Sequence, residues 1–381
     1  MTVKKGIILL SNLVLLVLLS SLDCKGCTSA IIGADLNPYG RPILWKHRDT
    51  STTDNKVEYV PGGEGVFSFV ALYNAGDKAL KEAWMGMNEA GFAVMNTASY
   101  NIKDDKLPAK KMDKEGFVMT KALRICRTVD DFAHLLDTLP RPMGVEANFG
   151  VIDAYGDGAY FETNNHSYIR YDLKDSPDGM LVRTNYSHSG RPNEGYGYVR
   201  EANAECLLAP YAQKKEITPE LLTEKISRTF YHDGKKRDFT FSGEKSLLDD
   251  DFIPRYKSTA TIAIEGCKPL TSGEKVDPEL VEKQYVMWTG IGYPPVSRIR
   301  AVKCSPDGVD EGLRGKLPNG HSLLGDEAVK KRGEVFSSKG KKMYIDITKL
   351  YNETGTGYAQ KAIEENRQTY DREIKMRDEK E

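Results

Sequence analysis

Short apolar runs recur along this chain and constrain its fold more than any other feature. Beyond the first fifty residues they occupy positions 65–74, 91–99, 147–164, 167–172, 180–185, 258–266 and 283–292. Runs of this length, rich in β-branched and aromatic residues and bounded by Gly, Asn and Asp, predict β-strands. The first runs follow one another without the strand–helix–strand alternation of a parallel sheet. The sequence therefore predicts an α+β fold with mostly antiparallel sheets.

Helical periodicity separates these runs at residues 116–139, 199–214 and 219–230. Thr218 followed by Pro219 is typical of a helix N-terminus. The tail over about 358–381 is rich in charge and predicts a solvated helix with a fraying end. Because the chain shows no internal repeat and no low-complexity linker, we expect one domain over residues 27–381.

The segment 27–49 predicts a β-hairpin. Two apolar runs flank Asn37-Pro38-Tyr39-Gly40, which is a turn sequence. A turn centred between Pro38 and Tyr39 pairs residues whose numbers sum to about 77. Asp49 is then expected beside Cys27.

The first 26 residues resemble an export signal. Lys4 and Lys5 precede the apolar run 7–22, which Asp23 ends. This run is shorter than a membrane span and contains polar residues, so we expect cleavage after Gly26, no permanent membrane span and an exported protein, periplasmic or secreted. A lipoprotein site at Cys24 is the alternative, although Asp23 stands where such sites have a small residue.

Cleavage at this point makes Cys27 the first residue of the mature chain. An N-terminal cysteine carries both a nucleophilic thiol and an α-amine that can accept its proton. The remaining cysteines are widely spaced and show no zinc-type spacing, so we expect no metal site. Counted together with Cys27 they are odd in number, so we expect a free thiol. Cys126 is expected to be a buried apolar residue. With 54 Lys and Arg against 55 Asp and Glu, the net charge of −1 makes nucleic acid an unlikely partner.

Four sequence blocks together resemble the N-terminal nucleophile hydrolases. They are GCTS at 26–29, WKHRD at 45–49, GMNEAGFAVMN at 86–96 and RTNYSHS at 183–189. The chain is similar at these blocks to the choloylglycine hydrolase and penicillin acyltransferase-type family, which includes acid ceramidase-like enzymes. The resemblance implies a four-layer αββα sandwich and hydrolysis of linear, non-peptide amide bonds.

The same resemblance implies roles for individual residues. Cys27 corresponds to the nucleophile that forms a thioester, and Asp49 to the carboxylate that orients the terminal amine. Asn96 and Asn185 correspond to donors toward the oxyanion. Lys46 stands where the family usually has an arginine. The lysine ammonium is a point charge, whereas the arginine guanidinium is planar and can form two parallel hydrogen bonds. A substrate-binding arginine of the family has two candidates, Arg255 and Arg298, and we favour Arg255.

Structural interpretations of these residues stay open at this stage. Asp49, Asn96 and Asn185 are also typical of turns and strand ends, and Lys46 of a solvated strand. His47, His166 and His188 are not expected to act as a base, because a terminal amine makes one unnecessary. Aromatic residues in the loops 186–198 and 231–257 suit either an apolar acyl pocket or simple packing.

The substrate expected from this reasoning is a small N-acyl amine or N-acyl amino acid, such as a conjugated bile acid or a lipid amide. No cofactor is implied. The family often forms dimers or tetramers, which implies a homo-oligomer without specifying its size. Two rival functions remain: a dipeptidase of the same nucleophile clan, and an exported binding protein that has lost activity.

Overall fold

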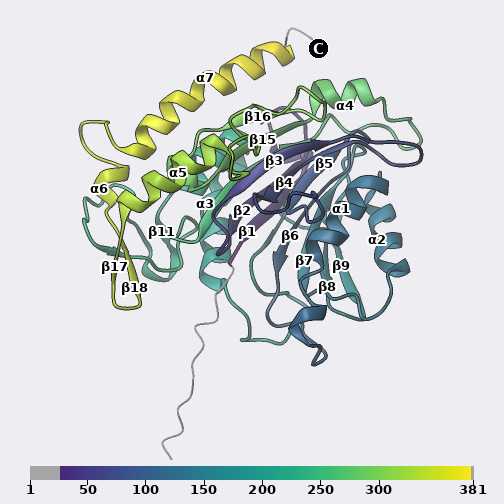
Figure 1. Ribbon diagram of the computed structural model, residues 1–381, viewed down its shortest axis with the longest axis horizontal. Coiled ribbons are helices and arrows are strands. Elements are labelled where there is room, and N and C mark those ends of the chain that lie inside the picture. The colour runs from purple at the N-terminus through teal and green to yellow at the C-terminus, as the bar shows by residue number, and fades with distance from the viewer. Residues whose placement is uncertain (1–25, 379–381) are drawn as a thin grey trace, which may run out of the picture.

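Two antiparallel sheets form the centre of the computed structural model, which describes residues 26–378 (Figure 1). The first sheet has six strands, in the order β10 (Met180–Arg183), β1 (Thr28–Ile32), β2 (Ile43–Asp49), β14 (Ser258–Glu265), β15 (Val286–Ile291) and β16 (Arg300–Val302). The second has seven strands in sequence order, β3 (Asn55–Val60), β4 (Phe69–Asn74), β5 (Met85–Asn88), β6 (Ala93–Ala98), β7 (Ala147–Ile152), β8 (Gly158–Thr163) and β9 (Tyr168–Asp172). All neighbouring strands in both sheets pair antiparallel, which confirms the predicted fold class.

The inner faces of the two sheets pack against each other. Leu44 and Ile262 of the first sheet share one buried cluster with Leu72, Met87 and Met95 of the second. Burial of such side chains contributes about 1.5–3 kcal/mol each, so this interface is the main source of stability at the centre of the molecule.

Helices cover both outer faces and complete four αββα layers. The helices α1 (Glu115–Ile125) and α2 (Val129–Thr138) pack on the second sheet through a cluster that joins Leu123 and Phe132 to Phe149. On the first sheet, α3 (Tyr198–Lys214) and α7 (Tyr358–Asp378) lie over Trp45 and Trp288. Figure 1 shows α7 lying across the top of the molecule and extending past it.

The helical stretch expected over 116–139 is two helices. Thr128 caps the second one, because its hydroxyl accepts from Asp131 N and the Asp131 carboxylate accepts in turn from Thr128 N. This capping box begins a new helix, and α1 ends at Ile125. The stretch 219–230 also differs from expectation, since it contains a π-helical turn at Leu221–Lys225 followed by a 3₁₀ turn at Ile226–Arg228.

A smaller apolar cluster lies beside the sandwich. It holds Phe252, Val296 and Ile345 and is covered by short elements that the sequence did not predict. These elements are β11 (Tyr231–His232), β12 (Arg237–Asp238), β13 (Leu247–Leu248), β17 (Phe336–Lys339), β18 (Lys342–Ile345), α5 (Leu323–Val335) and α6 (Ile347–Leu350). A further short helix, α4 (Pro278–Gln284), precedes β15.

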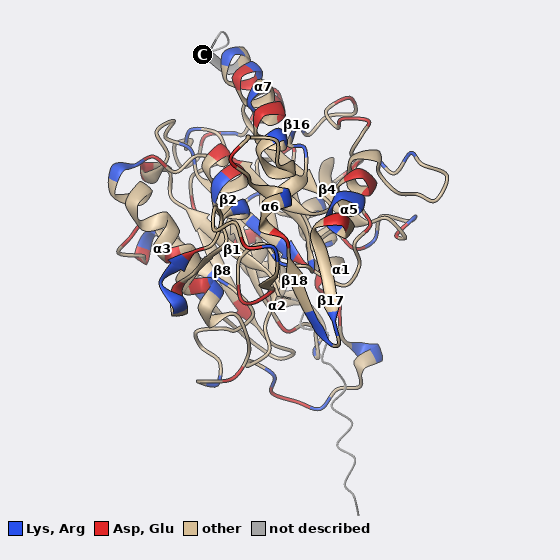
Figure 2. Cartoon of the chain, turned by 90° about the vertical axis from the view of Figure 1, so that its left-hand side faces the viewer, with Lys and Arg blue, Asp and Glu red and all other residues tan. Residues whose placement is uncertain are grey.

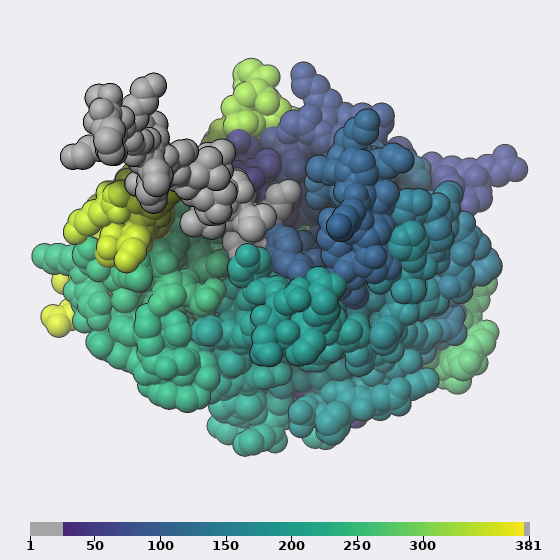
Figure 3. All heavy atoms as spheres, turned by 90° about the horizontal axis from the view of Figure 1, so that it is seen from below, coloured from purple at the N-terminus to yellow at the C-terminus, as the bar shows by residue number. Residues whose placement is uncertain are grey.

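Acidic and basic residues are interspersed over the visible side of the molecule and alternate along α7 (Figure 2). Seen from below, segments from the middle of the chain form much of the visible face (Figure 3). No helix among the described residues is long and apolar enough to cross a membrane. The predicted signal segment lies, except for Gly26, outside those residues.

Candidate active site

The first hairpin places Cys27 beside the end of β2. Thr28 pairs with His47 and Ile32 with Ile43, so partner numbers sum to 75 and not to the predicted 77. The error arises because a 3₁₀ turn at Ala34–Leu36 precedes the tight turn, which is therefore not the centre of the hairpin. The thiol of Cys27 still lies 3.8 Å from the backbone oxygen of Asp49.

Cys27 opens onto a small polar pocket between the two sheets. The pocket has a volume of about 100 Å³. It is lined by Cys27, Lys46, Arg48, Asp49, Thr50, Thr52, Asn74, Trp84, Asn96, Ala98, Asp113 and Glu115. Four residues predicted from the sequence thus meet here: Cys27 before β1, Lys46 and Asp49 on β2, and Asn96 on β6.

Lys46 crosses from one sheet to the other. Its ammonium donates to Asn96 Oδ1 and to the backbone oxygen of Trp84, both at 2.9 Å. Burial, together with the Arg48 charge, lowers the pKa of Lys46 to about 8, while Cys27 opposes the shift. Because the lysine holds Oδ1, the Nδ2 group of Asn96, which has no hydrogen-bond partner in the described chain, is left for a ligand.

Asp49 is held by partners from β14 and the loop before it. A β-bulge follows Ser258 and places Ser258 opposite Asp49. The Ser258 hydroxyl donates to Asp49 Oδ1 at 2.7 Å. Arg255 donates twice to Oδ2, at 2.6 and 3.0 Å, and the Asp49 side chain is only 1% exposed. His47 lies 2.8 Å from the Ser258 hydroxyl, and burial lowers its pKa to about 4. A neutral His47 therefore supports Ser258 and does not face the pocket.

Two arginines hold the peptide on either side of Cys27. Arg255 donates to the backbone oxygen of Gly26 at 3.1 Å, and Arg200 to that of Cys27 at 2.5 Å. A Cβ atom on Gly26 would lie 2.1 Å from the Arg255 guanidinium, so a larger residue at this position requires the Arg255 side chain to shift. Neither Arg255 nor Arg298, the two candidates for a substrate-binding arginine, lines this pocket, and Arg298 pairs with Glu327.

Asn185 lies near Cys27 but does not line the pocket. Its Oδ1 accepts from Arg200 at 2.9 Å, and its Nδ2 donates to the backbone oxygen of Ala98 at 2.8 Å. Arg200 thus connects Asn185 to the nucleophile. One N–H of the Asn185 amide remains beyond the bond to Ala98.

Sequence reasoning missed several groups around the site. Arg200 and Ser258 stand within a predicted helix and strand, where nothing distinguishes them from structural residues. Glu115 begins α1 and is buried in the pocket, where its Oε1 accepts from Glu146 N at 3.0 Å. Burial raises the pKa of Glu115 to about 7. A charged residue at a helix start is usually solvated, so the sequence around Glu115 did not indicate that its side chain is buried in the pocket.

The other cysteines of the described chain are free thiols away from this pocket. Burial raises the pKa of Cys126 and of Cys304 to about 12, which keeps both thiols protonated. Cys126 packs in the cluster under the second sheet, as predicted for an apolar residue.

Among the residues that the structure describes, two groups of side chains have spacings compatible with a cation, and neither lines the pocket. One is Asp54, His321 and Asp326, and the other Asp104, Asp105 and His166. In the first, opposite nitrogens of the His321 ring face different carboxylates, at 2.9 and 3.7 Å. This arrangement favours a bridge between two acids over ligation of one ion.

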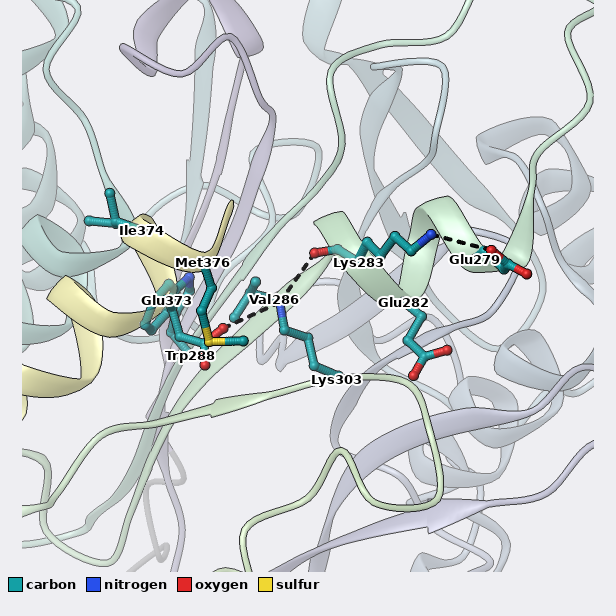
Figure 4. Close-up of a pocket in the computed structure, with 9 residues that line it drawn as sticks. All are labelled: Glu279, Glu282, Lys283, Val286, Trp288, Lys303, Glu373, Ile374 and Met376. Carbon is teal, nitrogen blue, oxygen red and sulfur yellow. Dashed lines mark hydrogen bonds and ion pairs between the residues drawn. The ribbon is translucent and has the colours of Figure 1, made fainter. Parts of the chain in front are cut away.

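A different pocket, of about 450 Å³, lies between α4, β15 and α7 (Figure 4). Trp288 and Ile374 line it together with charged residues such as Lys283 and Glu373. None of the residues predicted to act in catalysis lies there.

Part of the chain matches a known protein family. Residues 68–231, less than half of the chain, match the family described as acyl-coenzyme A:6-aminopenicillanic acid acyl-transferase. This confirms the resemblance seen in the sequence blocks and includes Asn96 and Asn185, but not Cys27. No curated protein matches the chain.

The chain is also similar to solved structures at low identity. An N-acylethanolamine-hydrolyzing acid amidase ortholog from Caenorhabditis elegans is 15% identical, with a TM-score of 0.37 over 50% of this chain and 85% of the other. A mutant conjugated bile acid hydrolase from Clostridium perfringens is 10% identical, with a TM-score of 0.44 over 75% and 95%. Penicillin V acylase from Agrobacterium tumefaciens is 11% identical, with a TM-score of 0.41 over 73% and 86%.

Proposed function

From the match to the penicillin acyl-transferase family, we propose that this protein is an N-terminal nucleophile hydrolase that cleaves a linear amide through Cys27. The observation that carries the proposal is the position of Cys27 at a polar pocket shared with Lys46, Asp49 and Asn96. These residue types supply a nucleophile, a cation, an acid and an amide donor around one small volume.

Activation of Cys27 requires the bond to Gly26 to be cut. The free α-amine then accepts the thiol proton as sulfur attacks the scissile carbonyl carbon. The Asp49 carboxylate is fixed by Arg255 and Ser258, and Arg255 also donates to the backbone oxygen of Gly26, so we assign this carboxylate the role of orienting the amine. Either a signal peptidase or the chain itself makes the cut.

The oxyanion formed in this step needs donors that are already oriented. Asn96 meets this requirement, because Lys46 fixes its Oδ1 and leaves Nδ2 facing the pocket. The ammonium of Lys46 also favours negative charge on the nearby sulfur. Asn185 is the second donor in this proposal, held through its oxygen by Arg200.

Collapse of the tetrahedral intermediate breaks the carbon–nitrogen bond. The leaving amine takes the proton from the Cys27 α-amine, and the acyl group stays on sulfur as a thioester. Water then attacks the thioester, gives its proton to the α-amine, and releases the carboxylic acid and the free thiol. Transfer of the acyl group to another amine is the alternative fate of the thioester.

We further propose that the protein is exported, on the basis of the apolar run 7–22 and the lysines before it. Cleavage after Gly26 would serve both export and activation. The substrate is expected to be a small N-acylated amine or amino acid.

The test is intact mass and N-terminal sequencing of the isolated protein, before and after treatment with iodoacetamide at neutral pH. We expect a chain that starts at Cys27, gains one label there and hydrolyses simple N-acyl amides. Cys27→Ala should remove the label at that position and the hydrolysis. Cys206→Ala removes an exposed thiol remote from the pocket, which iodoacetamide can also label, and should retain hydrolysis. A chain with Cys27 internal and unlabelled would contradict the mechanism and favour a binding protein.

A further inference from the structure

The pocket at Cys27 contains acidic groups that the proposed reaction does not use. Glu115 is 7% exposed, and Asp113 lies exposed at the rim of the same pocket. No ion pair within residues 26–376 involves either side chain. Asp49 differs from them because Arg255 neutralises it.

The buried carboxylate has no charged partner. Oε1 of Glu115 accepts from Glu146 N, the backbone N–H of Glu115 itself also donates to the carboxylate, and no side-chain donor among the described residues bonds it. The charges that act on this carboxyl are those of Asp113 and Glu146, which oppose its ionisation, as burial does. A bound cation would relieve both penalties at once.

The basic residues of the pocket do not neutralise this acidic wall. Lys46 donates to Asn96 and to the backbone oxygen of Trp84. Arg48 donates to the amide oxygens of Asn55 and Asn74. These cations are held by neutral acceptors on the strands, so the carboxyl of Glu115 is left without a basic partner.

The pocket is too small to enclose a large apolar acyl group. The pocket has about 100 Å³, against about 300–1,000 Å³ for sites that enclose a drug-sized ligand. Only Trp84 and Ala98 contribute apolar side chains to it apart from Cys27. The loop aromatics that suited an acyl pocket lie elsewhere: Tyr186 stacks on Tyr198, and Phe239 packs in the smaller cluster.

We propose that Glu115, assisted by Asp113, binds a primary ammonium group carried by the amide substrate. The substrate class is then short aminoacyl amides or mono-acylated diamines, which share this chemistry and differ in the half of the amide that bears the cation. An ammonium offers three donors and a full charge, and hydrogen bonds between ionised groups are stronger than neutral ones. The inference rests on the proposed function, since it concerns the substrate of the same Cys27 site.

The experiment compares isosteric substrate pairs on the isolated protein with a verified Cys27 N-terminus. The first pair is 4-aminobutanoyl and pentanoyl 4-nitroanilide, and the second is N-butanoyl-1,3-diaminopropane and N-butylbutanamide. We expect kcat/KM for the ammonium member of one pair to exceed that of its neutral partner by about tenfold to hundredfold. The pair that shows this preference identifies the half of the amide that binds the carboxylates.

Variants connect the preference to the acidic wall. Glu115→Gln keeps an oxygen for Glu146 N–H but loses the charge, so the ratio of kcat/KM within the pair should fall toward one. Asp113→Asn should lower the ratio less, because Asp113 is exposed. This variant also tests the acidic wall if Glu115→Gln does not fold. Glu279→Gln, an exposed acid lining the pocket of Figure 4, should leave the ratio unchanged.

Different failures have different meanings. Ratios near one in both pairs, or a strong preference that survives in both acid variants, would overturn the ammonium subsite while leaving amide hydrolysis intact. A protein labelled at Cys27 that hydrolyses neither ammonium substrate would also overturn it. A protein that is neither labelled nor active contradicts the proposed function itself.

Discussion

At the scale of single residues, the orientation of two asparagine amides determines what the site can do. An asparagine side chain carries an acceptor oxygen and a donor nitrogen, and a half-turn of its amide group exchanges their positions. Lys46 bonds the oxygen of Asn96, and Arg200 bonds the oxygen of Asn185. Each cation thereby fixes the orientation of the amide; in the proposed mechanism this leaves Nδ2 of Asn96, and the second N–H of Asn185, for the oxyanion.

Lys46→Met should expose this dependence. Without the ammonium, Asn96 is free to turn its oxygen toward the oxyanion, so we expect kcat to fall by about 10²–10³, the usual loss for one oxyanion donor. Lys46→Arg, which restores a donor to Oδ1, should recover part of this loss. Steady-state kinetics measure the effect, and Lys78→Met at an exposed site is the control. An equal loss in the arginine variant would show that Lys46 does not act through a donated hydrogen bond.

At the scale of elements, α7 is attached more firmly than its composition indicates. The sequence predicts a solvated helix, yet Ala359, Ala362, Asn366 and Tyr370 are buried along one face. Tyr370 stacks on Trp288 at 4.6 Å between ring centroids. The spacing of three and four residues forms a stripe against the first sheet, so this part of the helix is an outer layer of the sandwich.

Asn366 is the polar anchor of this helix, and its loss should loosen α7. It accepts from Ile299 N at 2.8 Å and donates to Glu224 at 2.9 Å. Asn366→Ala leaves Ile299 N without its partner and removes one of the bonds to Glu224, which keeps Arg228 and Tyr370, so we expect the free energy of unfolding to fall by about 1–3 kcal/mol. Arg367→Ala on the exposed face should cost less than about 0.5 kcal/mol. Chemical denaturation measures both, and equal effects would mean that Asn366 does not anchor the helix.

At the scale of the whole molecule, two buried acids make stability depend on pH. Burial raises the pKa of Glu115 and of Glu224 to about 7, above the ordinary value of 4.5. The folded chain therefore binds protons between about pH 4.5 and 7 that the unfolded chain has released. Stability from these groups is complete below pH 4.5 and is lost as the pH rises through 7.

Glu115→Gln should flatten this dependence. A shift of about 2.5 pKa units corresponds to about 3 kcal/mol, so the variant should gain roughly that much relative to the original chain between pH 5 and pH 8. The measurement is the midpoint of denaturant unfolding at both pH values, with exposed Glu279→Gln as control. Parallel pH profiles for the two proteins would show that Glu115 titrates normally in the folded state.

The sequence by itself predicted most of the longer strands, the class of fold and Cys27 as the candidate nucleophile. Strand periodicity and turn residues are local, so the runs 258–266 and 283–292 could be assigned without knowing their partners. The blocks around Cys27, Lys46, Asp49 and Asn96 predicted residues that meet in one pocket although they span 70 positions.

Only the tertiary structure decided which groups surround those residues. Arg200, Ser258 and Glu115 come from segments far apart in the chain, and no local pattern marks a buried charge that contacts a distant backbone. The register of the first hairpin was also known only from the structure, because a 3₁₀ turn shifts the strand pairing by an amount that the turn residues do not specify. Local propensity selects elements, whereas burial and the pairing of polar groups across the two sheets select the site.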